Sequence, residues 1–123
     1  NYQWCHLVPA DRDYQEWGDM ASAYYEKFDR EFDVPYFPHV SIGWDPNPRY
    51  PEGLQPCVTG STPARFEAFL RRAKAYVDAH PDQPPLITIN AWNEWAEGSC
   101  LEPDSLNGYG YLEAVKRVFR TIE

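Results

Sequence analysis

The stretch LITINAWNEWAEG, residues 86–98, decides the fold of this chain. Its first part, residues 86–92, is mostly apolar and β-branched, and this composition predicts a buried strand. Two carboxylates, Glu94 and Glu97, follow directly after it. In folds built from parallel strands, the loops after the strands carry the functional groups. The stretch therefore predicts an α/β fold with a candidate site just beyond this strand.

The rest of the chain predicts two more strands and three helices. Aromatic and β-branched residues predict strands at 2–8 and 36–44. Apolar residues three and four apart predict amphipathic helices. The helices are expected at 11–32 with Asp11 or Asp13 as N-cap, at 62–80 with Thr62 as N-cap before Pro63, and at 111–122. Two long polar loops, residues 45–61 and 93–108, follow the second and third strands.

Strands and helices alternate along the chain, and no hairpin sequence is evident. Such alternation indicates parallel strands joined by crossover helices. Two architectures satisfy it: a small open sheet, or three consecutive units of a (β/α)8 TIM barrel. The chain has 123 residues, whereas a closed barrel needs roughly 250. Long loops after the strands and short ones before them favour part of a barrel.

Charge and composition disfavour several classes of function. Nineteen acidic residues against 11 basic ones give a formal net charge of −8, which disfavours nucleic acid as a partner. The sequence lacks an uninterrupted apolar run of about 18 residues, so no membrane span is predicted. Aromatic residues make up 16% of the chain, and their flat faces suit sugar rings among other ligands.

The cysteines Cys5, Cys57 and Cys100 are too few and too scattered for a disulfide framework. No C-x-x-C pair or histidine spacing is typical of a zinc site, and we expect neither a metal nor a cofactor. An odd number of cysteines leaves at least one free thiol, which favours a reducing, cytoplasmic compartment. The strand-like start leads us to expect a natural N-terminus upstream of Asn1, which leaves the compartment open.

Glu94 and Glu97 are the candidate catalytic residues. Paired carboxylates perform glycoside hydrolysis, in which one protonates the leaving oxygen and the other acts as base or nucleophile. The indoles of Trp92 and Trp95 offer an apolar setting that favours the protonated form of a carboxyl group. The alternative is a pair of solvated loop carboxylates, because Glu-x-x-Glu is a common spacing.

Eight residues in or after the second and third strands are candidates for binding a substrate. They are Trp44, Asp45, Arg49, Asn90, Trp92, Asn93, Trp95 and Glu102. Asp45 and Arg49 either reach over the site or form an ion pair within their loop. Asn90 needs hydrogen-bond partners, which lie either within the fold or on a ligand. At least one tryptophan is expected in a wall or the core, and Glu102 either binds a hydroxyl or caps a turn.

The stretch ITINAWNEWAEGSCLEPD, residues 87–104, followed by GYGYLEA, resembles the terminal motif of the WbsX-like proteins. These bacterial proteins are encoded with polysaccharide gene clusters and are usually labelled glycosyltransferases. They are similar in turn to glycoside hydrolase family 99, the endo-α-mannosidases and endo-α-mannanases, whose motif reads NEWHEG. Residues 35–50 resemble the preceding motif of that family, which runs proline, glycine, an aromatic residue, Asp and Arg.

This resemblance implies that residues 1–123 are the C-terminal three units of a single glycoside-hydrolase-like (β/α)8 barrel. It implies that Glu94 removes a proton from the sugar 2-hydroxyl, which attacks the anomeric carbon. Glu97 is then the general acid and afterwards the base. Ala96 stands where family 99 has a histidine, so the expected mannoside pocket lacks one ring.

Three functions are open on the sequence. The favoured one is a retaining, endo-acting glycoside hydrolase on α-linked, mannose-like glycans, with an oligosaccharide or polysaccharide as substrate. The second is a WbsX-type, glycosyltransferase-like role in surface polysaccharide biosynthesis, although the chain has no glycine-rich phosphate-binding loop. The third is a non-catalytic glycan-binding domain. Because a three-stranded arc exposes two edges, we expect the rest of the barrel or another chain to cover the sheet.

Overall fold

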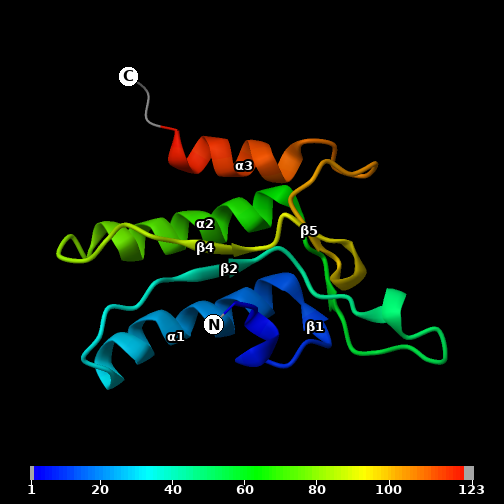
Figure 1. Cartoon of the computed structure of the whole chain (residues 1–123), viewed down its shortest axis with the longest axis horizontal. Coiled ribbons are helices and arrows are strands. Elements are labelled where there is room, and N and C mark those ends of the chain that lie inside the picture. Colours follow the sequence, from blue (N-terminus) through cyan, green and yellow to red (C-terminus); the bar gives the residue numbers. More distant parts are fainter. Residues whose placement is uncertain (1, 121–123) are drawn as a thin grey trace.

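The structure is a computed structural model that describes residues 2–120. Its helices are α1 (Tyr14–Glu31), α2 (Pro63–Asp78) and α3 (Gly110–Phe119). Figure 1 shows them side by side in chain order, with α2 between α1 and α3. Strands β2 (His39–Ser41) and β4 (Thr88–Asn90) run along this helix layer and pair in parallel. The predicted α/β class is confirmed for this part of the chain.

The central strands keep the predicted order and direction but are shorter than predicted. The register pairs Val40 with Ile89, and α2 forms the crossover between the two strands. A proline limits the start of β2, since it cannot donate a backbone hydrogen bond to a neighbouring strand, and before β4 the Leu86 N–H bonds locally to the Pro84 carbonyl oxygen at 2.9 Å. Pro38 directly precedes β2, and Pro84-Pro85 lies before β4.

The predicted strand at residues 2–8 is wrong. This segment forms a 3-10 helix, Trp4–His6, in which the Gln3 side chain accepts the Trp4 N–H at 2.9 Å. The Trp4 indole donates to the His39 carbonyl oxygen at 2.9 Å, so side chains occupy the outer edge of β2. An apolar run does not by itself distinguish a strand from an irregular segment that is buried by its side chains.

The two loops predicted to be irregular contain short strands. After β2, the strand β3 (Val58–Thr59) pairs in parallel with β1 (Arg12–Asp13). After β4, the strands β5 (Asn93–Glu94) and β6 (Ser99–Cys100) pair antiparallel around a 3-10 turn. The expectation of no hairpin is therefore wrong. This turn uses Gly98 at φ 59° and lacks the Asn-Gly or Asp-Gly pair by which short hairpins are usually predicted.

The helix starts follow the predicted caps. Asp13 accepts the Gln15 N–H at 2.9 Å before α1, and Thr62 accepts the Arg65 N–H at 3.3 Å before α2. Asp11, the alternative cap, lies outside the helix. Helix α2 ends at Asp78, before the predicted end at residue 80. Helix α3 ends at Phe119, and its predicted end at residue 122 lies outside the described residues.

The core lies between the helices and one face of the strands. Trp4 packs edge-on against Trp17 of α1 and Phe69 of α2, with ring centroids 5.2 and 5.3 Å apart. Val40 and Ile42 belong to the same buried cluster. Within residues 2–120, no helix has an apolar stretch long enough to cross a membrane.

The opposite face of the strands is polar and buried at β2. His39 lies with Nδ1 2.8 Å from Thr88 Oγ1 and Nε2 3.0 Å from Ser41 Oγ. Burial is the main cause that lowers the pKa of His39 to about 4, so the ring is neutral near pH 7. Gln3 donates to Asn90 Oδ1 at 2.7 Å, which gives Asn90 a partner within the fold.

Candidate functional site

Two loops meet at the carboxyl ends of the parallel strands β2 and β4. The loop after β2 carries Asp45 and Arg49, and the segment after β4 carries Glu94 and Glu97. The Asp45 N–H donates to the Glu97 carbonyl oxygen at 2.7 Å, which joins the loops directly. The structure thus brings four of the predicted site residues together.

Two glycines permit this close approach. A Cβ at Gly43 would lie 2.6 Å from the Gly98 carbonyl oxygen, and a Cβ at Gly98 would lie 3.0 Å from Asp45 Cβ. Gly98 also adopts a positive φ of 59°, which side chains rarely tolerate. The glycines therefore set how near the two loops can come.

Arg49 contacts both candidate catalytic carboxylates. Its Nη1 lies 2.6 Å from Glu97 Oε1, and its Nη2 lies 3.3 Å from Glu94 Oε2. The Glu97 side chain is 13% exposed and the Glu94 side chain 44%, so the shorter contact involves the more enclosed carboxylate. The hydrogen bond to Glu97 raises the pKa of Arg49, which is fully charged at any physiological pH.

The loop that holds Arg49 is organised by Asp45 and Asn47. Asp45 Oδ1 accepts the Asn47 backbone N–H at 3.0 Å and the Asn47 side-chain amide at 2.7 Å. Asn47 in turn accepts the Gln55 N–H at 2.6 Å, which closes the loop across residues 47–55. Asn47 and Gln55 were not among the predicted site residues, although Asp-Pro-Asn is typical of a side-chain-stabilised turn. Arg49 contacts the glutamates, whereas the Asp45 side chain supports the loop.

Two tryptophans that neighbour the glutamates in sequence have exposed side chains. Trp92 is 54% exposed and Trp95 is 52% exposed. The Trp95 indole donates to Glu102 Oε2 at 2.7 Å, so Glu102 orients this ring. Trp44 differs from both, because it is partly buried against the core as one tryptophan was expected to be.

The two predicted asparagines have different surroundings. Asn93 is exposed at the start of β5, next to Glu94. Asn90 is buried and bonds to Gln3, so its hydrogen-bonding capacity is at least partly used inside the fold. Residues 2–120 contain no cluster of three or more histidine, cysteine or acidic side chains arranged to hold a metal ion.

The sequence Asp11-Arg12-Asp13 has the D-x-D spacing found in many metal-dependent sugar transferases. In the structure, Asp13 caps α1 and accepts a 2.8 Å hydrogen bond from Arg65. The Asp13 carboxylate is therefore already engaged in a structural role.

The α/β fold thus presents paired carboxylates, a guanidinium that contacts both, and exposed indoles after its parallel strands. Residues 4–115 match the model of the family described as Glycosyltransferase WbsX, and the chain belongs to that family. The match covers both strand–loop segments of the site.

Two curated relatives share the name Uncharacterized protein WxcX and come from two strains of Xanthomonas campestris pv. campestris. The protein of strain ATCC 33913 is 34% identical over 106 residues, which are 85% of this chain and 15% of the relative. The protein of strain B100 is 34% identical over 103 residues, which are 83% of this chain and 14% of the relative. The chain thus spans about a seventh of these relatives. No solved structure matches it.

Proposed function

We propose that this chain carries the catalytic carboxylates of a retaining, endo-acting glycoside hydrolase on α-linked, mannose-like glycans. Glu94 takes the proton of the sugar 2-hydroxyl as this oxygen attacks the anomeric carbon and the glycosidic bond breaks. Glu97 protonates the departing oxygen. In the second step Glu97 takes a proton from water, the water oxygen opens the anhydro-sugar, and the 2-oxygen recovers a proton from Glu94.

The observation that carries the proposal is the contact of one guanidinium with both carboxylates. Arg49 contacts Glu97 at 2.6 Å and Glu94 at 3.3 Å, so both carboxyl groups lie around one guanidinium. Paired carboxyl groups held side by side match the pair of acid and base groups that glycoside hydrolysis uses.

The exposed tryptophans support a sugar as the substrate. Indole faces provide flat apolar area, and an indole N–H bonded to a carboxylate keeps its ring in one orientation. Trp95 has this arrangement through Glu102, and Trp92 is exposed nearby in the sequence. We assign Trp92, Trp95 and Asn93 to substrate contact, with Asp45 and Glu102 as supports.

We further propose that residues 1–123 are the C-terminal three units of a (β/α)8 barrel. Support comes from the parallel pair β2 and β4, its helical crossover α2, and the site at the carboxyl ends of the strands. The first of the three units contributes α1, whose preceding segment lies against β2 through side chains.

The test compares Glu97→Gln and Glu94→Gln in the complete protein on α-linked oligosaccharides and on the matching glycosyl fluorides. Glu97→Gln should lower kcat/KM on oligosaccharides about 10²–10⁴-fold but spare the fluorides, since fluoride departs without a proton. Glu94→Gln should damage both substrate types, because deprotonation of the 2-hydroxyl is needed whichever group leaves.

The matched control is Glu113→Gln, an exposed glutamate of α3, which should leave both rates unchanged. A 2-deoxy substrate lacks the internal nucleophile and should be inert with the unaltered protein. Equal losses in both variants on every substrate would contradict the assigned roles. Full activity in both variants would leave the chain a glycan-binding domain.

A glycosyltransferase-like role in surface polysaccharide biosynthesis is the second candidate, because the matched family is described as a glycosyltransferase. Such a role predicts sugar transfer from a nucleotide-sugar donor to an acceptor glycan. Incubation with labelled nucleotide sugars separates the two functions, since the hydrolase needs no donor. The engagement of Asp13 with α1 and Arg65 weighs against a donor-metal site at that D-x-D sequence.

A further inference from the structure

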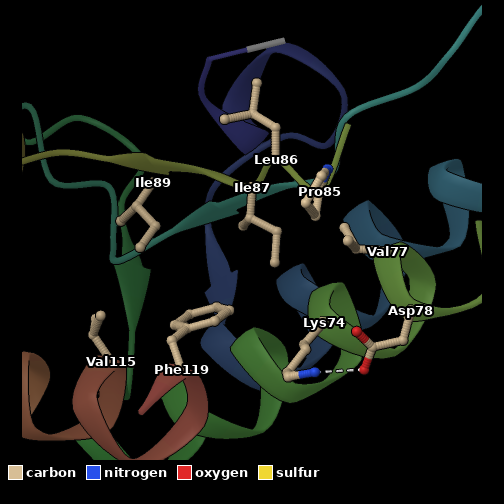
Figure 2. Close-up of a pocket in the computed structure, with 9 residues that line it drawn as sticks. All are labelled: Lys74, Val77, Asp78, Pro85, Leu86, Ile87, Ile89, Val115 and Phe119. Carbon is tan, nitrogen blue, oxygen red and sulfur yellow. Dashed lines mark hydrogen bonds and ion pairs between the residues drawn. The ribbon is translucent and has the colours of Figure 1, made fainter. Parts of the chain in front are cut away.

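The two faces of β4 carry different kinds of side chain. Figure 2 shows Ile87 and Ile89 pointing toward α3 across an apolar pocket of about 390 Å³. Successive residues of a strand point to opposite faces, so Thr88 and Asn90 lie on the other side of β4. On that side, Asn90 bonds to Gln3, a fully buried residue that takes no part in the chemical steps of the proposed reaction.

The Gln3 amide joins the carboxyl ends of both parallel strands. Its Nε2 donates to Asn90 Oδ1 at 2.7 Å and, at 3.4 Å, to the Gly43 carbonyl oxygen. Asn90 is the last residue of β4, and Gly43 lies two residues after the end of β2. Gln3 precedes both strands, so a third segment of the chain bridges their ends.

Both strand ends are linked by short contacts to the segment that carries the glutamates. On the β2 side, the Asp45 N–H donates to the Glu97 carbonyl oxygen at 2.7 Å. On the β4 side, Ser99 Oγ donates to the Asn90 carbonyl oxygen at 2.9 Å and closes the turn between these two residues. A change in the spacing of the strand ends therefore moves the backbone around Glu97.

A chain of hydrogen-bonded side chains fixes the orientation of the Gln3 amide. The Trp4 N–H donates to Gln3 at 2.9 Å, so the accepting atom is the amide oxygen, and the Ser41 hydroxyl donates to the same oxygen. Because the Ser41 proton points to Gln3, Ser41 Oγ accepts from His39 Nε2, 3.0 Å away. The neutral ring of His39 then carries its proton on Nε2, and its Nδ1 accepts from the Thr88 hydroxyl at 2.8 Å. The donors all point from Thr88 toward Gln3, which leaves the Gln3 N–H groups facing the strand ends.

We infer that Gln3 is a positioning residue, whose amide holds the ends of β2 and β4 at the spacing that places Glu97 against Arg49. Because Gln3 is fully buried, it acts through the backbone of the two segments and not by contact with a substrate. Losing its hydrogen bonds leaves several buried polar groups to find new partners, which shifts the segments that carry them. The effect of Gln3 on catalysis rests on the proposed function, whereas its effect on the backbone does not.

The first test is hydrogen exchange in the complete protein at the Asp45 amide, which joins the two loops. Gln3→Met keeps the length of the side chain but removes its donors and its acceptor. We expect the Asp45 amide to exchange about tenfold or more faster relative to amides of α2, because the strand ends are no longer joined. The matched control, Gln15→Met, removes an amide that donates to Asp19 at 3.2 Å on α1 and should change neither rate. Equal acceleration at Asp45 and in α2, or no acceleration, would overturn the inference.

The second test reads the direction of the hydrogen-bond chain from the unaltered protein, so it does not depend on whether a Gln3 variant folds. Magic-angle-spinning NMR of protein with labelled histidine nitrogens distinguishes a protonated ring nitrogen from an unprotonated one. Near pH 7, His39 should carry its proton on Nε2 alone, with its signal assigned by the loss of that signal in His39→Gln. A proton on Nδ1, or on both nitrogens, would overturn the chain that orients Gln3.

The third test compares kcat/KM on α-linked oligosaccharides with kcat/KM on the matching glycosyl fluorides. A smaller folded fraction lowers both values equally, whereas a displaced Glu97 slows only the substrate whose leaving group needs a proton. We expect Gln3→Met to lower the ratio of the two values about tenfold or more, and an unchanged ratio would overturn the positioning role. A protein that hydrolyses neither substrate contradicts the proposed hydrolase, while the first two tests still decide whether Gln3 holds the strand ends.

Discussion

Arg49 is the residue on which the candidate site most depends. It is about half exposed, and exposed ion pairs contribute under about 1 kcal/mol to folding. Its contacts join the loop after β2 to the segment after β4 across 45 and 48 residues of sequence. Because these contacts add little stability but join two segments, we infer that Arg49 positions the two carboxylates.

At the residue scale, Arg49→Gln should therefore lower hydrolysis on the order of a hundredfold, the cost of a displacement of about 1 Å at a catalytic group. Arg49→Lys should recover little, because an ammonium lacks the fork that reaches two carboxylates. The free energy of urea unfolding should change little in both variants, because exposed ion pairs contribute little to stability.

The matched control is Arg65→Gln, which removes an exposed arginine paired with Asp13 at 2.8 Å, away from the glutamates. It should keep its activity. Unchanged activity in Arg49→Gln, or a loss that merely follows a lower melting temperature, would contradict the positioning role.

At the element scale, the contact between the loop after β2 and the hairpin of β5 and β6 depends on Gly43. A Cβ there meets the Gly98 backbone at 2.6 Å, a contact that side-chain rotation cannot relieve. The two segments must separate to admit it, and the hydrogen bond from Asp45 to the Glu97 carbonyl oxygen lies beside this point.

Gly43→Ala should consequently destabilise the protein by about 1–3 kcal/mol, the usual cost of overpacking, and reduce activity by moving Glu97. Gly53→Ala is the control, since an added Cβ meets nothing within 4 Å there. Its unfolding free energy should change by less than about 0.5 kcal/mol. Similar free energies of urea unfolding for the two variants would show that the loops do not constrain each other.

At the scale of the whole molecule, His39 makes stability depend on pH. Its pKa in the folded protein is about 4, against 6.5 for an unperturbed histidine, because burial disfavours the charged ring. The unfolded chain binds more protons between these values, so the stabilisation is complete above pH 6.5 and is lost as pH falls toward 4.

We predict that lowering pH from 7 to 5 costs the unaltered protein about 2 kcal/mol more than it costs His39→Gln. Urea unfolding at the two pH values measures this difference. His6→Gln, at an exposed histidine, should retain the full dependence. His80 opposes the trend, because the Tyr76 carbonyl and then Asp29 raise the pKa of His80. If the unfolding free energy of His39→Gln falls as much between pH 7 and pH 5 as that of the unaltered protein, His39 is not the source of the pH dependence.

Local sequence determined the helices, the order and direction of β2 and β4, and the place of the glutamates after β4. Helix caps at Asp13 and Thr62 are hydrogen bonds within three residues, and amphipathic periodicity repeats within one turn, so short stretches suffice to predict them. A carboxylate after a buried strand is likewise a local feature.

Only the tertiary structure decided which distant groups meet. Gln3 bonds to Asn90 across 87 residues, and Arg49 selects the two glutamates in preference to Asp45, its neighbour in the loop. Residues 2–8 form a 3-10 segment whose Trp4 indole bonds to the His39 carbonyl oxygen at the edge of β2. That partner lies outside the segment, so no pattern within the seven residues could predict the contact. Such contacts depend on how the elements pack, and packing is a property of the folded chain as a whole.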